Sequence, residues 1–505
     1  MQSSKWSFIR LTLIILAVNI ALTAWTVYVK PVLNYDAILY ITAAKAISNG
    51  DWQLATELYQ GSLYPFLIQL LSSISGLSFE NAAHGLNSLF LTIICLAFIS
   101  TVRLLGGSSK SVLIISSIVI VFFPSLLKFR PFIIRDFAYL SCYLWSIYFL
   151  LAYYQSNKTF HLASWAALLC LGACFRIESV IFLVFIGFLL TLSYAFKRVR
   201  KGHYAPITGI SIVAILMLGA LLYLPTLMID VMGLNSLVMS LSYPTEYINK
   251  AISQLSEKLA ISSNESGGTL VAILKPFGNV VYETLKRLEV IYAILAFIAF
   301  KMRLTLSQSY QRRVIACYIG INIIVLSLFE VSLSYLTSRY TLALALTILL
   351  LAPFTLEKAI ENFSERKTAT KFALSLLIIA LCFVSLKRLE VSERHIEATA
   401  GKWIKTNLND NQIIISNNSK ILYYANQNPY FCFKKCNHHY KFSTRFLLHK
   451  QNKGSFEQAN YLVFLVNKKD PIDIQKENEF KRQFGEPIKR FVQNEKLYVH
   501  VYKLK

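Results

Sequence analysis

Apolar runs of bilayer-spanning length recur along this chain and constrain its fold more than any other feature. Of its 505 residues, 55% are hydrophobic and 15% are charged, and the mean hydropathy is +0.49. A run of about 20 apolar residues can cross a bilayer as a helix, so the pattern predicts a polytopic α-helical membrane protein. We expect about eleven spans, near residues 11–29, 84–104, 111–127, 137–154, 161–175, 178–196, 206–228, 285–300, 314–334, 340–356 and 371–388.

The charge distribution orients these spans. The net charge is +24, but the cations are dispersed among short loops between apolar runs, which argues against a nucleic-acid partner. Because cytoplasmic loops carry an excess of Lys and Arg, we expect the N-terminus inside the cell and the chain after about Lys387 outside. The first span lacks a small-residue cleavage site before Lys30, so we interpret it as a retained signal anchor. The expected location is the inner (plasma) membrane of a bacterium, with membrane lipids as partners.

Three regions lie outside the membrane on this topology: residues 30–83, 229–284 and 389–505. Residues 1–388 then form a transmembrane domain that carries the first two regions as external loops. In the first loop, apolar residues at helical spacing predict interfacial helices. The 389–505 region combines helical and strand patterns, which predicts a small extracytoplasmic α/β domain. Its helix is expected at 401–405 and its strands at 412–416, 461–466 and 497–502.

A charged loop, Lys128-Phe-Arg-Pro-Phe-Ile-Ile-Arg-Asp136, lies between two long apolar runs. Polar groups near a bilayer are expensive, so Lys128, Arg130 and Arg135 suggest a binding site for an anionic ligand of phosphate character. Asp136 is open to four interpretations. It is a second catalytic acid or a ligand of a divalent metal (Mg or Mn), or it pairs with Arg135, or it caps the following helix.

Two further charged residues lie at the expected outer membrane edge. Asp36 directly follows the first span, where a carboxylate could take a proton from an acceptor hydroxyl as a general base. Alternatively, Asn34 or Asp36 caps the helix that starts there. Arg339 opens the tenth span from outside, and a guanidinium group can bind two phosphate oxygens at once. The alternative for Arg339 is snorkelling toward the membrane interface beside Tyr335 and Tyr340.

Other candidates favour structural roles. Arg176 and Glu178 are expected to pair with each other at a tight hairpin rather than to contact a ligand directly. His84 at the start of the second span is more typical of an interfacial hydrogen-bonding residue than of a catalyst. Cys432 and Cys436 are expected to form a local disulfide, because their spacing is a weak zinc signature. The sequence has no Gly-rich phosphate loop, so we expect no nucleotide cofactor.

Short motifs follow one another along the chain in a recognisable order. They are Asn34-Tyr-Asp36, Asn49-Gly-Asp51, Gly61-Ser-Leu-Tyr-Pro65, Arg130-Pro-Phe-Ile-Ile-Arg-Asp136, Phe175-Arg-Ile-Glu178, Ser338-Arg-Tyr340 and Gly401-Lys-Trp-Ile-Lys405, with Asn87 at the opening of the second span. In this order they resemble the GT-C glycosyltransferases that use a polyprenyl-phosphate sugar, a group that contains protein O-mannosyltransferases and the lipid A aminoarabinose transferase. The resemblance covers the whole chain and implies a GT-C-like fold.

The resemblance also implies an activity. A hexose or pentose would pass, with inversion, from a polyprenyl-phosphate-linked donor to a lipid, glycan or protein acceptor. Ala37 stands where many members have a second acid, and Tyr64 where many have a basic residue, so the acceptor class does not follow. The rival hypothesis is a lipid or solute transporter or flippase that holds anionic headgroups with the same cations. The implied site comprises Asp36 as base, Asp136, a phosphate group of Arg339, Arg130, Arg135 and Lys128, and structural or substrate contacts from Arg176, Glu178, Tyr64, His84 and Tyr340.

Overall fold

The computed structural model describes residues 2–59, 61, 63–199, 253, 268–333, 336–364, 395–409, 412–427 and 459–504. The chain divides into two compact units. The bundle unit comprises Met1–Ala24 and Ile41–Leu389, and the α/β unit comprises Trp25–Tyr40 and Glu390–Lys505. The predicted spans 206–228 and 371–388, most of the predicted loop 229–284, and the predicted Cys432–Cys436 disulfide lie outside the described residues.

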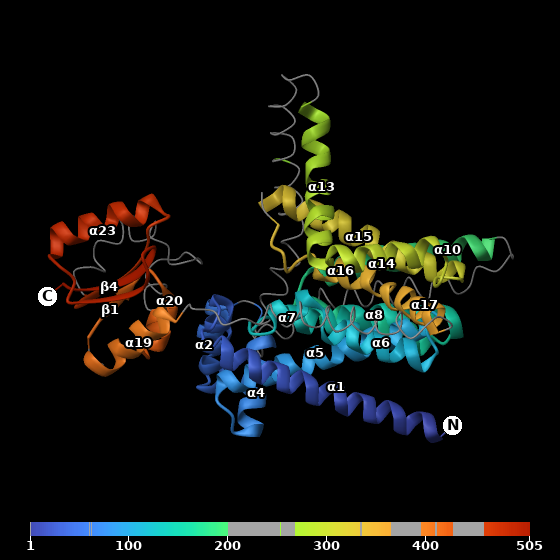
Figure 1. Ribbon diagram of the computed structural model, residues 1–505, viewed down its shortest axis with the longest axis horizontal. Helices are drawn as coiled ribbons and strands as arrows, with labels where there is room; N and C mark the ends of the chain where they lie inside the picture. Colours follow the sequence, from blue (N-terminus) through green and yellow to red (C-terminus); the bar gives the residue numbers. More distant parts are fainter. Residues whose placement is uncertain are drawn as a thin grey trace. The chain divides into compact units, whose positions relative to one another are not determined.

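The predicted polytopic helical architecture is confirmed. Within the described residues, six helical segments are long and apolar enough to cross a bilayer: Ile9–Val29, Phe79–Leu104, Lys110–Phe129, Asp136–Ser156, Ser309–Val331 and Leu342–Glu361. Shorter apolar helices at Thr159–Ala173, Glu178–Leu190 and Val290–Lys301 coincide with further predicted spans. Every predicted span that falls on described residues therefore coincides with an apolar helix (Figure 1).

The helices of residues 2–364 differ in length. Two predicted spans, 111–127 and 340–356, are each built from two helices. The bounds are α1 (Gln2–Val29), α2 (Tyr35–Ser48), α3 (Trp52–Leu58), α4 (Leu63–Ser75), α5 (Phe79–Leu104), α6 (Lys110–Val121), α7 (Pro124–Phe129), α8 (Asp136–Ser156), α9 (Thr159–Ala173), α10 (Glu178–Val199), α13 (Gly268–Leu288), α14 (Val290–Lys301), α15 (Ser309–Leu333), α16 (Leu342–Leu349) and α17 (Ala352–Ser364).

Local sequence explains where several of these helices begin and break. The side chains of Ser78 and Ser109 accept backbone hydrogen bonds and cap α5 and α6. Pro124 lies in the first turn of α7. A backbone N–H at this position has no acceptor within the helix, so proline, which lacks the N–H, is well tolerated there. It divides the predicted span 111–127 into α6 and α7. The chain then leaves the helix at Arg130, so the charged loop is free to adopt its own path to α8.

Helix α8 is buried along most of its length and packs against α5, α9, α15 and α16. Its polar side chains are bonded to those of neighbouring helices. The Tyr143 hydroxyl lies 2.7 Å from Thr347 Oγ1 and accepts a hydrogen bond of 2.7 Å from Asn322 Nδ2, while Ser146 Oγ lies 2.7 Å from the Tyr318 hydroxyl. Because unpartnered polar groups in an apolar core are costly, these bonds fix α8 within the bundle and provide a rigid base for its N-terminal residue, Asp136.

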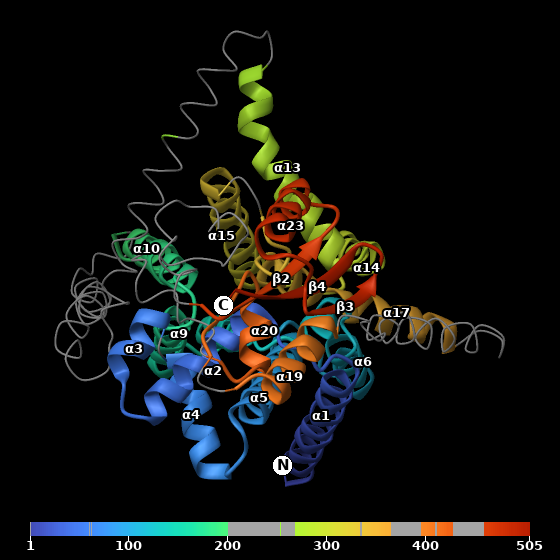
Figure 2. The same ribbon diagram turned by 90° about the vertical axis from the view of Figure 1, so that its left-hand side faces the viewer.

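The α/β unit contains a four-stranded sheet in the order β1-β2-β4-β3, in which β1 and β2 are parallel and the other pairs are antiparallel. Alternate residues of β2 and β4 face opposite sides of the sheet, where α19 and α20 cover one face and α23 the other (Figures 1 and 2). The predicted strands are confirmed as β1, β2 and β4. The bounds are α19 (Ile396–Asn407), β1 (Ile414–Ser416), α20 (Ser419–Tyr424), β2 (Tyr461–Asn467), α23 (Pro471–Phe484), β3 (Lys489–Asn494) and β4 (Leu497–Lys503).

Candidate active site

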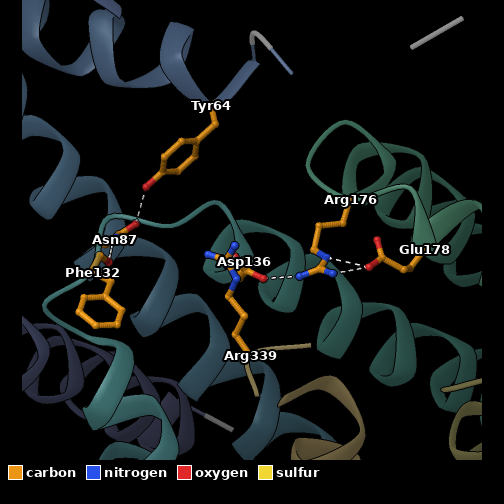
Figure 3. A network of polar contacts seen from close by, with 7 residues as sticks. All are labelled: Tyr64, Asn87, Phe132, Asp136, Arg176, Glu178 and Arg339. Atoms are coloured by element: carbon orange, nitrogen blue, oxygen red, sulfur yellow. Dashed lines mark hydrogen bonds and ion pairs between the residues drawn. The ribbon is translucent and has the colours of Figure 1, made fainter. Parts of the chain in front are cut away.

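Asp136 is the first residue of α8 and is only 4% exposed. Its Oδ1 accepts a short hydrogen bond from Arg176 Nη1, and its Oδ2 lies 3.9 Å from Arg339 Nη1 (Figure 3). The two arginines come from the α9–α10 turn and from the turn before α16. Asp136 is thus paired with two arginines that are distant from it in the sequence.

Arg176 is the most heavily paired member of this group. Its Nε donates to Glu178 Oε1 at 3.0 Å, and its Nη2 makes a short bond to the same oxygen. Burial by itself would lower the pKa of Arg176, but the carboxylates of Glu178 and Asp136 outweigh burial and hold the pKa well above its ordinary value. The expected pairing with Glu178 is thus present, and Arg176 also bridges to α8.

Two aromatic rings complete the surroundings of this guanidinium. The Arg176 Cζ lies 4.2 Å from the centre of the Tyr340 ring and 5.5 Å from that of Tyr139, distances at which cation–π attraction operates. Tyr340 is among the residues predicted from the sequence, whereas Tyr139 is not. The available signal was spacing, since Tyr139 follows Asp136 by one helical turn and lies on the same side of α8.

Arg339 forms the accessible edge of the cluster. Its side chain is 29% exposed, whereas those of Arg176 and Asp136 are 8% and 6% exposed. Its contact with Asp136, at 3.9 Å, is much longer than that of Arg176. Two carboxylates and two guanidinium groups balance in charge, and Arg339 is the more exposed of the two cations. A guanidinium in this position can turn toward an incoming anion without leaving Asp136 unpaired, because Arg176 remains in place.

A second chain of contacts holds the loop that leads to Asp136. The buried Tyr64 of α4 donates from its hydroxyl to Asn87 Oδ1 at 2.6 Å, and Asn87 Nδ2 donates to the carbonyl of Phe132 at 2.8 Å (Figure 3). Burial raises the pKa of Tyr64, and the nearby carboxylate of Asp136 raises it further. Tyr64 is therefore a neutral donor that connects α4, α5 and the charged loop.

The three cations of the charged loop separate in the folded chain. Arg130 is 1% exposed, and its guanidinium donates to Asn19 Oδ1 at 2.9 Å, to the Asn19 carbonyl at 3.1 Å and to Thr23 Oγ1 at 3.3 Å. It points toward α1 and not into the Asp136 cluster. Arg135 lies over the ring of Tyr59, 5.4 Å from its centre, and Lys128 is partly exposed at the end of α7.

The remaining candidates lie apart from this cluster or in the other unit. Asp36, in the first turn of α2, is partly exposed and belongs to the α/β unit. The positive end of the helix dipole also stabilises an acid in the first turn. Asp36 can therefore stabilise the start of α2 and serve as a base. His84 is buried in α5, and its Nδ1 has no hydrogen-bond partner among the described residues.

The donor set around Asp136 does not fit a divalent cation. Mg²⁺ and Mn²⁺ prefer several oxygen ligands, whereas both Asp136 oxygens face guanidinium nitrogens, whose positive charge repels a metal ion. In the part of the chain that the structure describes, no group of three or more His, Cys, Asp or Glu side chains is arranged to hold a metal. The cluster instead combines features of an anion site: one partly exposed guanidinium group, that of Arg339, a buried counter-charge and aromatic packing.

Comparison with known proteins identifies the fold. No protein-family model and no curated protein sequence matches the chain. Among solved structures, the chain is similar to ArnT from Cupriavidus metallidurans, in a crystal structure bound to undecaprenyl phosphate, with a TM-score of 0.52 and 9% sequence identity. The match covers 97% of each chain. The similarity shows that the two chains share a fold, which confirms the GT-C-like fold predicted from the sequence motifs.

Proposed function

We propose that this integral membrane protein is a glycosyltransferase that transfers a hexose or pentose from a polyprenyl-phosphate-linked donor to a lipid, glycan or protein acceptor. One observation carries the proposal. Arg339 lies at the accessible edge of a buried, charge-balanced cluster with Asp136, Arg176 and Glu178. The GT-C fold adds support, because the ArnT structure that shares it is bound to undecaprenyl phosphate.

Asp36 acts as the general base in this proposal. Its carboxylate takes the proton of the acceptor hydroxyl or amine, and the acceptor atom attacks the anomeric carbon of the sugar from the side opposite the phosphate. The bond between the anomeric carbon and the phosphate oxygen breaks, and the electron pair leaves with the lipid phosphate. The configuration at the anomeric carbon is therefore inverted.

Arg339 stabilises the phosphate as it leaves. Negative charge grows on the phosphate oxygens during bond breaking, and a preorganised cation at that place lowers the barrier. Asp136 orients Arg339, and Arg176 holds Asp136 in position. Arg135 and Lys128, both partly exposed, contribute further positive charge nearby in the chain. No step in this mechanism uses a metal or a nucleotide cofactor.

The first test concerns the base. Asp36→Asn keeps the shape of the side chain but removes its basicity, so we expect transfer to fall by roughly 10²–10⁴-fold while expression and membrane insertion are retained. Glu57→Gln is the matched control, since it removes an exposed carboxylate on α3. Product formation is measured by mass spectrometry of cell-envelope glycolipids and glycoproteins from cells with and without the protein. Normal transfer by the inserted Asp36→Asn protein would remove Asp36 from the mechanism.

The same comparison separates a transferase from a transporter. If the protein is a transferase, cells without it contain a glycolipid or glycoprotein that lacks its sugar, and the purified protein transfers that sugar. If it is a flippase, the unmodified lipid-linked sugar accumulates on one side of the membrane in cells without it, and the purified protein transfers no sugar. Reporter fusions test the proposed topology at the bacterial inner membrane: a reporter after Lys505 is expected outside and one in the loop 197–203 inside.

A further inference from the structure

The segment that leads into Asp36 is short and not helical. Helix α1 ends at Val29 and α2 begins at Tyr35, so residues 30–34 have backbone groups that a helix does not satisfy. Leu33 is 5% exposed, and a buried backbone N–H needs an acceptor. The Leu33 N–H donates to the hydroxyl of Tyr424 at 3.0 Å, across 391 residues of sequence.

Tyr424 makes a second bond to the same segment. Its hydroxyl donates to the carbonyl of Pro31 at 3.2 Å, so a single side chain accepts from one residue of the segment and donates to another. The neighbouring Lys420 places its ammonium group 4.8 Å from the centre of the Tyr35 ring, within cation–π range. Pro31, Leu33 and the first residue of α2, Tyr35, therefore all contact one helix, α20.

The α/β unit is built to hold α20 in this place. The N-terminus of α20 is capped by the Asn418 side chain, which accepts from the Lys420 N–H at 2.9 Å. Lys420 also pairs with Glu397 of α19 at 3.7 Å. Gly401 of α19 allows close contact, because a Cβ at this position would lie 2.6 Å from both the Ile421 carbonyl oxygen and the Tyr424 Cβ.

We infer that α20 positions the Asp36 carboxylate by holding the segment that leads into α2, and this inference rests on the proposed role of Asp36 as the base. Asp36 is the second residue of α2 and lies one residue after Tyr35. Misplacement of a reacting group by about 1 Å can reduce a rate by 10²-fold. Tyr424 and Lys420 are thus positioning residues. Through them the α/β unit contributes to catalysis, although neither side chain contacts the substrate.

The contact itself is tested by hydrogen–deuterium exchange on the full-length protein in nanodiscs. Tyr424→Phe keeps the ring and removes the hydroxyl that joins Pro31 and Leu33, so the Leu33 amide is expected to exchange about ten-fold faster. Tyr423→Phe makes the same chemical change one position earlier on α20 and is expected to leave exchange at 31–36 as in the wild type. Exchange in α19 serves as a control that the α/β unit remains folded.

The positioning role is tested with the glycosylated product identified by the comparison of cells with and without the protein. Tyr424→Phe is expected to lower product formation by about 10- to 100-fold, with binding of undecaprenyl phosphate unchanged. Combined with Asp36→Asn, it should cause no further loss, because both changes act through the same carboxylate. A purely structural role would instead reduce phosphate binding and add to the effect of Asp36→Asn.

Either of two results would overturn the inference: wild-type exchange at 31–36 in Tyr424→Phe, or wild-type product formation in a variant whose exchange is faster. Full product formation by Asp36→Asn would overturn the proposed function and the positioning role with it. That failure is distinguishable, because exchange at 31–36 would still depend on Tyr424.

Discussion

Arg176 offers the sharpest test of how the buried cluster is held together. The side chains of Asp136 and Glu178 are 6% and 11% exposed, and both carboxylates bond to its guanidinium. Arg176→Met fills similar volume, and among the described residues it leaves Asp136 one ion-pair contact, at 3.9 Å to Arg339. Removing one partner of a buried ion pair costs about 3–5 kcal/mol, because the remaining charge stays out of water.

Matched variants separate this charge effect from lost packing. In the triple variant Arg176→Met, Asp136→Asn, Glu178→Gln, no uncompensated carboxylate remains, so most of the lost stability should return. Lys358→Met breaks the pair with Glu361 in which the two side chains are 46% and 59% exposed, and it should cost about 0–1 kcal/mol.

The assay is thermal unfolding of the purified full-length protein in detergent, followed by tryptophan fluorescence at one fixed scan rate. We expect Arg176→Met to lower the Tm on the order of 5 °C, and Lys358→Met to leave it nearly unchanged. Equal Tm values for Arg176→Met and Lys358→Met would refute the reasoning. A triple variant no more stable than Arg176→Met would show that packing, and not charge, holds this region.

Three further predictions concern other parts of the chain. Arg339→Lys and Arg339→Ala should both weaken binding of undecaprenyl phosphate. Lysine should keep a minority of the affinity, because its ammonium group cannot hold two phosphate oxygens at once. Equal affinity of Arg339→Lys and wild type would favour snorkelling. Burial lowers the pKa of His500 to about 4, although Glu477 opposes this, so the folded state binds fewer protons than the unfolded state. Stability from this site is full above about pH 6.5 and falls as the pH decreases toward 4. Protection factors in β4, corrected for the intrinsic amide exchange rate at each pH, should therefore be lower at pH 5 than at pH 7, and His500→Gln should abolish this difference. Gly401→Ala should displace Tyr424 and speed exchange at 31–36, because its Cβ would meet backbone atoms of α20; unchanged exchange would contradict the close packing.

Hydropathy predicted the spans well because burial in lipid needs only length and apolar composition. Hydropathy predicted less well where one helix ends and the next begins. The predicted span 111–127 is divided at Pro124, and the predicted span at 285 begins at Val290, since α13 continues to Leu288. Mean hydropathy over a span-length stretch does not locate either break, although Pro124 marks the first and the charged Lys286, Arg287 and Glu289 mark the second.

Hydropathy patterns also predicted the buried strands of the α/β unit better than the exposed one. β1, β2 and β4 have buried apolar residues and were predictable, whereas β3 (Lys489–Asn494) was missed. β3 lies at the edge of the sheet and is mostly exposed. Edge strands carry charged residues that discourage further pairing, and this hides their alternation from a sequence reading.

For the candidate site, the sequence identified the charged residues but not their partners. Asp136 and Arg339 were expected near one phosphate, and they lie in contact. Arg130 shares a loop with Asp136, yet its guanidinium points to α1. Adjacent residues of a loop can face different elements, and only tertiary packing decides which. The link from Tyr424 to Leu33 spans most of the chain and had no sequence signal.

The bond from Arg130 to α1 also bears on how the protein assembles in the membrane. Among the described residues, 28% of the apolar stretch of α1 is buried, so its polar bonds to neighbouring helices matter for holding it in place. Asn19 reaches Thr92 of α5 at 3.3 Å, but its two guanidinium bonds come from a residue made 111 positions later. Helix α1 is therefore expected to complete these bonds only after α7 has emerged from the ribosome, which imposes an order on membrane assembly.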